Sequence, residues 1–220
     1  MSKKNVTCPT CGRKLKVEIV NIIQENDEAA WKALLSHRLN TCTCPDCGTS
    51  FMVNEPLYYF DKSNPFILAY INDDGEEENA FELEHWFDDT AEEIAEKEGI
   101  EKPVTRLTTT IWDFIEKIFI WRLGIDDRLV EFAKQQLFRN TDLDKLSRTQ
   151  HRLLLDFSAT DNEKLVFLVF DRETNQPTGR MHVPMEEFKK LSEEFQGNDQ
   201  LMNELDTLFP SCIVSVDRLI

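Results

Sequence analysis

One short pattern occurs twice in this chain, as Cys8-Pro9-Thr10-Cys11-Gly12 and as Cys44-Pro45-Asp46-Cys47-Gly48. Two residues between the cysteines of a pair allow both sulfurs to bind one metal ion, and the glycine that follows accepts a left-handed backbone. Thiolate sulfur favours zinc or an iron–sulfur centre, and a pair of CPxCG turns is typical of structural zinc. The sequence therefore predicts one zinc ion, bound by Cys8, Cys11, Cys44 and Cys47.

The alternative interpretation of these cysteines is a disulfide or two pairs of free thiols. It gives no role to the repeated proline and glycine, and disulfides belong to oxidising compartments. The N-terminus carries Lys3 and Lys4 without the apolar stretch of a secretory signal behind them, and no apolar run approaches the length of a membrane span. We therefore expect a cytoplasmic protein with reduced cysteines.

Residues 6–71 resemble the CpXC domain, which is named for such paired cysteine motifs. The resemblance rests on VTCPTCGRKLKVEIVN, on KALLSHRLN and on TCTCPDCGTSFMVNEPLYYFD. A later part of the chain also resembles longer members of the family, in Glu116-Lys117-Ile118 and in the run from Gly124 to Glu131. The resemblance implies a zinc-binding protein of bacterial type. It brings no established biochemical activity with it.

The net charge of −16 is concentrated in one segment. Residues 71–101 hold fourteen acidic residues and one lysine, which accounts for −13 of the total. Residues 1–20 are basic instead, with five Lys and Arg against Glu18 alone. A nucleic-acid-binding protein usually has a basic stripe over much more of its surface, so the charge favours a protein partner over nucleic acid.

Residues 1–72 are expected to form an enlarged zinc ribbon. Leu15, Val17 and Ile19 alternate with charged residues and predict a half-buried strand after the first cysteine pair. Asp27 is placed to cap a helix over Glu28 to Leu39. Further strands are expected over residues 51–53, 57–60 and 66–71.

Residues 73–150 are expected to be helical. An apolar stripe that includes Trp86, Phe87 and Ala91 predicts an acidic helix that packs one face on the protein and ends at Gly99. The acidic face could instead be a docking surface for a basic partner. Residues 104–140 predict a helical hairpin in which Asp126 caps the second helix, and a shorter helix is expected near residues 143–148.

Residues 151–220 predict a small α+β domain whose sheet is covered by helices on one face. The expected elements, in chain order, are strands 153–157, 164–170 and 179–183, helices 184–195 and 200–208, and a strand over 212–216. The whole chain is thus expected to belong to the α+β class, with a zinc-ribbon-like antiparallel module, a helical middle and a C-terminal sheet domain.

A metal ion with four cysteine ligands has no open position for water or substrate, so it is expected to support structure. Cys42 lies two residues before Cys44 and would face the same side of a strand, either near the metal or as a buried free thiol. Asp126, Asp127, Arg128 and Glu131 form a charged cluster that helix capping and local pairing explain, and that could otherwise form a recognition or acid–base site.

These observations favour a zinc-binding, non-enzymatic protein that acts as a scaffold for other macromolecules, most of all proteins. The first alternative is an enzyme with a site around Asp126, Asp127 and Arg128. The second is a nucleic-acid-binding module that uses the basic first cysteine pair.

Overall fold

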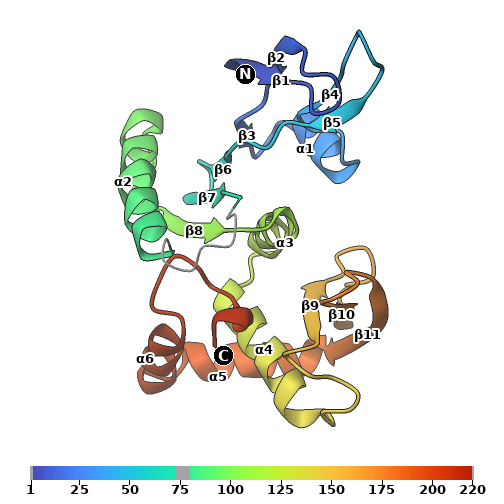
Figure 1. Cartoon of the computed structure of the whole chain (residues 1–220). Helices are drawn as coiled ribbons and strands as arrows, with labels where there is room; N and C mark the ends of the chain where they lie inside the picture. The colour runs from blue at the N-terminus through green and yellow to red at the C-terminus, as the bar shows by residue number, and fades with distance from the viewer. Residues whose placement is uncertain (1, 73–79, 220) are drawn as a thin grey trace. The chain divides into compact units, whose positions relative to one another are not determined.

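The computed structural model describes residues 2–72 and 80–219 and has the α+β architecture expected from the sequence (Figure 1). Its residues group into two compact units, one up to Phe114 and the other from Ile115 on. The boundary between the units falls inside one helix. The division into residues 1–72, 73–150 and 151–220 stays a prediction.

The first unit begins with two small antiparallel hairpins, each of which carries one cysteine pair at its turn. Their strands are β1 (Ser2–Thr7), β2 (Lys14–Ile19), β4 (Thr41–Thr43) and β5 (Ser50–Met52). Between them lies α1 (Glu28–Leu35), where the Asp27 side chain accepts a hydrogen bond from Ala30 N as predicted. The helix ends earlier than expected because the Ser36 hydroxyl donates to backbone oxygens of the last turn and His37 adopts a left-handed φ of 55°.

A mixed four-stranded sheet forms the core of the first unit, in the order β3-β6-β7-β8. Its strands are β3 (Ile22–Gln24), β6 (Leu57–Asp61), β7 (Phe66–Tyr70) and β8 (Val104–Thr108). The outer pairs are parallel and the central pair is antiparallel. Helix α2 (Ala80–Glu98) packs against β7 and β8, burying Phe87 and Ala91, whereas Trp86 is 45% exposed. Gly99 ends this helix with φ of 68°.

Strand β8 corrects the expected helical hairpin, because Leu107 lies in the sheet and not on a helix face. The run from Val104 to Thr110 is rich in β-branched residues, which favour strand. The helices of this region are α3 (Ile111–Arg122), which contains the unit boundary, and α4 (Asp127–Asn140). The helix expected near residues 143–148 is replaced by turns.

The second unit holds an antiparallel sheet in the order β11-β10-β9. The strands are β9 (His151–Leu155), β10 (Lys164–Asp171) and β11 (Pro177–Pro184). Leu165, Phe167 and Val169 alternate along β10 and pack into one core with residues of α4, α5 (Met185–Gln196) and α6 (Asp199–Leu208). The expected strand over 212–216 is irregular chain that leads into a 3-10 turn, η2 (Val216–Arg218).

Candidate metal centre

The turn of the β1–β2 hairpin positions the first cysteine pair. Cys8 N donates to Arg13 O at 2.8 Å, and Gly12 N donates to Cys8 O at 3.0 Å, so the loop closes on itself with both sulfurs on one side. Gly12 has φ of 73°, and a Cβ atom there would meet nothing within 4 Å. The left-handed backbone, and not crowding, therefore requires glycine at this position.

The second cysteine pair repeats this geometry at the turn of the β4–β5 hairpin. Cys44 N donates to Thr49 O at 2.8 Å, and Gly48 N donates to Cys44 O at 2.9 Å. Gly48 has φ of 72°. The two motifs of the sequence are thus two copies of one local structure.

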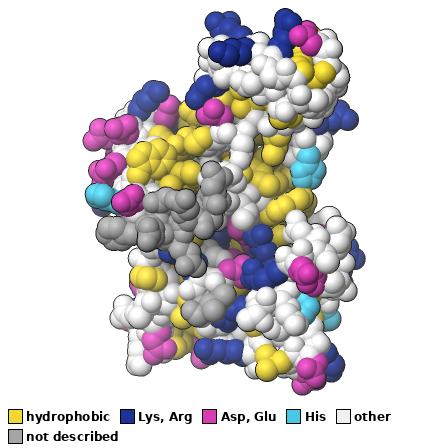
Figure 2. All heavy atoms as spheres, viewed as in Figure 1, with side chains coloured by type: hydrophobic (Ala, Val, Ile, Leu, Met, Phe, Trp, Pro, Cys, Tyr) yellow, Lys and Arg dark blue, Asp and Glu magenta, His cyan; other side chains and the backbone are white. Residues whose placement is uncertain are grey.

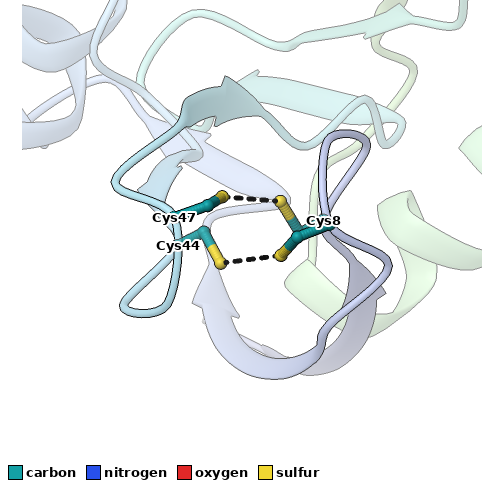
Figure 3. A group of neighbouring side chains, drawn as sticks. Cys8, Cys44 and Cys47 are labelled. Carbon is teal, nitrogen blue, oxygen red and sulfur yellow. Dashed lines mark hydrogen bonds between the residues drawn. The ribbon is translucent and has the colours of Figure 1, made fainter.

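The two loops bring the four sulfurs together. All four Sγ atoms lie within 4.8 Å of one another, and Figure 3 shows the two closest pairs facing each other across the loops. Cys8 Sγ lies 3.6 Å from Cys47 Sγ, and Cys11 Sγ lies 3.6 Å from Cys44 Sγ. A tetrahedron with metal–sulfur bonds of about 2.3 Å has edges of about 3.8 Å, whereas a disulfide needs about 2.05 Å. The cluster therefore fits one tetrahedral metal ion and not a disulfide.

In both cysteine pairs the first cysteine is buried and the second is exposed. Cys8 and Cys44, the first cysteines of their motifs, are 1% exposed, whereas Cys11 and Cys47 are exposed. The first cysteine of each loop thus faces the protein and the second closes the site from the solvent side.

An ion pair joins the two loops outside the sulfur cluster. Arg13 follows the first motif and donates from Nη1 to both carboxylate oxygens of Asp46, at 2.8 and 2.6 Å. Asp46 lies inside the second motif, where the first has Thr10. Sequence reasoning missed this contact. Its signal in the sequence is a basic residue, Arg13, beside the first motif and an acidic residue, Asp46, in the second.

The clustered thiols perturb one another. Hydrogen bonding with the side chain and backbone of Thr49 lowers the pKa of Cys47 to about 6. A backbone hydrogen bond from Arg13 acts to lower the pKa of Cys11, but partial desolvation by the neighbouring loop and hydrogen bonds with the other three thiols outweigh it and raise that pKa to about 12. Four sulfurs this close ionise one after another, so a metal cation that replaces their protons stabilises the fully ionised cluster.

Cys42 is not part of the four-sulfur cluster. It is half-buried in β4, opposite Phe51 of β5. Burial raises the pKa of its thiol, and the nearby Cys8 and Cys44 sulfurs raise it further. Cys212 is half-buried in the irregular segment before η2.

The family model of the CpXC protein matches residues 6–134, which is more than half of the chain. The chain belongs to the CpXC family. The matched range extends from the first cysteine motif into α4, and so includes both loops of this CpXC chain. No curated protein and no solved structure gives a significant match.

Asp126, in the CpXC-matched range, caps α4 as the sequence predicts. Its side chain accepts from Arg128 N at 2.9 Å. The Arg128 guanidinium also donates to Asp126 at 3.0 and 2.6 Å and reaches Asp206 of α6. These carboxylates raise the pKa of Arg128. The Asp126–Arg128 contacts therefore stabilise the helix start and link it to α6.

The partners of Asp127 and Glu131 differ from the local pairing expected from the sequence. Their side chains are 12% and 2% exposed, and both face Lys117 of α3, at 2.9 and 3.3 Å. Lys134 lies 2.7 Å from Glu116 and 2.9 Å from Glu131. We call this set the buried charge network; its members are Glu116, Lys117, Asp127, Glu131 and Lys134.

Two carboxylates of the buried charge network also accept hydrogen bonds from backbone N–H groups. Glu116 accepts a hydrogen bond from Leu155 N in β9, and Glu131 accepts one from Val216 N at 2.9 Å. The network thus ties α3 and α4 to the sheet and to η2. Burial acts to raise the pKa of Glu131, but Lys134 and Lys117 outweigh it and lower that pKa.

A cavity of about 480 Å³ lies beside the start of α4 in the second unit. Asp126 lines it, together with residues of α5 such as Lys189 and Ser192, whereas Asp127 and Arg128 are not among the lining residues. Of the three residues of the suggested enzyme site, this cavity therefore contains Asp126 alone.

Proposed function

We propose that this CpXC protein binds one Zn²⁺ through Cys8, Cys11, Cys44 and Cys47, and that the ion stabilises the first unit. The observation that supports the proposal is the four-sulfur cluster, whose closest edges of 3.6 Å suit a single tetrahedral ion. The protein supplies all four ligands, so the ion has no position for water or substrate and its role is structural. A single iron ion is the competing occupant, because it accepts the same ligands.

Cysteine substitutions test the metal ligands. Binding of zinc at such sites contributes on the order of 10 kcal/mol to folding. Cys47→Ser is therefore expected to lose the metal and to unfold the first unit, and Cys11→Ala is expected to do the same. Cys42→Ser is the matched control, because Cys42 lies outside the cluster and should keep the metal. A Cys47→Ser protein with full metal content and an unchanged melting curve would refute the ligand set.

We infer further that the protein is a non-enzymatic scaffold for a protein partner. A closed metal site supports this, and so does the acidic surface of α2, where carboxylates gather in Figure 2. Glu92 and Glu93 of α2 are exposed. Glu76, Glu77 and Glu78 belong to the same acidic segment but lie outside the described residues. A partner with basic residues would suit this surface.

The first hairpin gives less support to nucleic-acid binding than its sequence suggests. Basic side chains gather over it in Figure 2, but Lys3 pairs with Glu18, Lys4 with Glu55 and Arg13 with Asp46. These pairs neutralise charge that a phosphate backbone would otherwise contact. We therefore propose a protein as the partner and treat nucleic acid as the less favoured alternative.

Co-purification at two salt concentrations tests the scaffold function. The untagged protein should retain a protein partner at low salt and release it at high salt, because exposed charges are screened over about 10 Å at 0.1 M. Glu92→Gln with Glu93→Gln should weaken the retention without changing the melting temperature. Recovery of nucleic acid alone, or a turnover that requires Asp126, would refute the scaffold and favour one of the two alternatives. We expect the protein in the cytoplasm, where thiols stay reduced.

A further inference from the structure

A groove of about 590 Å³ lies between α4, α5 and α6 of the second unit. Helices α5 and α6 pack together, and Phe132 of α4 meets Phe195 of α5 edge-on with ring centroids 5.2 Å apart. The groove falls mostly outside the residues that the family model matches. We call it the helical groove.

Apolar side chains form much of the lining of the helical groove. Six apolar side chains line it: Phe132, Leu191, Phe195, Leu201, Leu205 and Leu208. Phe195 and Leu205 are buried at 6% and 1% exposure, whereas the other four are half-buried and present apolar surface to the groove. On α6 the three leucines follow the spacing i, i+4, i+7, so one whole face of this helix is turned toward the groove.

The charges around the groove are strongly unequal. Helices α5 and α6 carry seven carboxylates and two lysines, and Lys190 is already paired with Glu186. Two of the carboxylates, on Glu194 and Glu204, line the groove and are exposed. Arg139 at the end of α4 is the one cation among the lining residues. The walls formed by α5 and α6 therefore favour a cationic occupant.

A buried polar side chain also reaches the groove. Gln135 of α4 lines it and is 4% exposed, so its amide is a polar group on a largely apolar surface. An occupant that hydrogen bonds to this amide would gain an interaction that the leucines cannot give.

We propose that the helical groove binds a basic amphipathic helix of a protein partner. The leucines of α5 and α6 would contact the apolar stripe of that helix, Glu194 and Glu204 its flanking Lys or Arg residues, and Gln135 a polar group at the centre. The proposal rests on the proposed function, because it adds to the acidic surface of α2 a second surface, and a partner chemistry, through which the scaffold acts.

Peptide binding to the full-length, metal-loaded chain tests the groove. The probe is a synthetic peptide of about 18 residues, or five helical turns, with a leucine stripe flanked by lysines. It should bind with a change in fluorescence anisotropy. The same composition in scrambled order, and the version with Glu in place of Lys, should not bind. Equal binding of the scrambled peptide would overturn the proposal.

Charge reversal locates the binding site. Glu194→Lys combined with Glu204→Lys should lower the affinity for the lysine peptide by roughly tenfold, since each reversal removes an attraction and adds a repulsion at the rim of the groove. Glu193→Lys is the matched control, because Glu193 is exposed on the same helix but does not line the groove, and affinity should stay within about twofold. An equal loss in both proteins would overturn the proposal.

Two further outcomes distinguish failure of the groove proposal from failure of the scaffold function. If the co-purifying partner is retained by the Glu194→Lys, Glu204→Lys protein as strongly as by the unchanged protein, the groove proposal fails while the scaffold function stands. If the chain forms a dimer that the same reversal dissociates, the occupant is a second copy and the proposed partner is refuted. Partner retention lost by the double reversal and kept by Glu193→Lys would support both.

Discussion

Replacing Lys134 by Met should destabilise the second unit more than any exposed charge substitution. The Lys134 side chain is 3% exposed, and its Nζ lies 2.7 Å from Glu116 and 2.9 Å from Glu131. Methionine keeps much of the volume but removes the ammonium. Glu116, Asp127 and Glu131 would then face Lys117 as the one remaining lysine of the network.

The expected loss of unfolding free energy is about 3–5 kcal/mol, which is typical when one partner of a buried ion pair is removed. Lys190→Met is the matched control. Lys190 lies at the same 2.7 Å from a carboxylate, that of Glu186, but both side chains are at least 70% exposed. Its loss should stay below about 1 kcal/mol, because water screens the exposed pair.

Urea unfolding followed by circular dichroism would measure both changes in the zinc-saturated protein. Adding Glu116→Gln to Lys134→Met should recover part of the loss, since it removes one of the carboxylates left facing a single lysine. If Lys134→Met costs no more than Lys190→Met, burial does not strengthen this network and the reasoning is wrong.

Four other substitutions have defined outcomes. Asp126→Ala should cost about 1 kcal/mol through the lost helix cap, and Asp127→Asn should cost more than an exposed pair would, because Asp127 faces the buried Lys117; melting curves of both variants check this. Gly48→Ala should lower stability by about 1 kcal/mol, because φ is 72° there and open space around the Cβ gives no compensating contact; an unchanged melting temperature would argue against the left-handed loop. The pKa of Glu131 is lowered from 4.5 in the folded protein, so the ionised side chain stabilises the fold at pH values above 4.5. This stabilisation is lost as the pH falls through the folded-state pKa. Glu131→Gln should therefore reduce the fall in unfolding free energy that is measured on acidification.

The four-cysteine cluster could be predicted almost completely from the sequence, because its geometry is mostly local. Cys8 and Cys11 share one turn, as do Cys44 and Cys47, and a repeated glycine marks the required backbone. Only the pairing of the two loops is long-range, and the demand for four ligands implied it. The link between Arg13 and Asp46 was missed, because Asp46 occupies the variable position of the second motif and Arg13 follows the first, so the repeated residues do not indicate it.

The buried charge network could not be predicted in the same way. Spacing along α4 suggested that Asp127 and Glu131 act on each other or on Arg128, whereas their partner Lys117 lies on another helix. Nothing in the local pattern indicates that five ionisable residues are buried together. The same network reaches the end of the expected strand 212–216, where Glu131 accepts the hydrogen bond of Val216 N at the start of η2.

Strand β8 was missed for a different reason. Leu107 fits the helical spacing of Ile111 and Phe114, so periodicity alone extended the helix backward over the strand. The β-branched residues around it carried the correct signal, and pairing with β7 decides the outcome.

Metal analysis by native mass spectrometry, together with elemental analysis of the same sample, tests the central claim most directly. The account predicts one Zn²⁺ per chain, lost in Cys47→Ser and kept in Cys42→Ser. After the metal is removed from the unchanged protein, all six cysteines should titrate as free thiols. A metal-free folded chain, a disulfide between the two loops, or iron in place of zinc would contradict it.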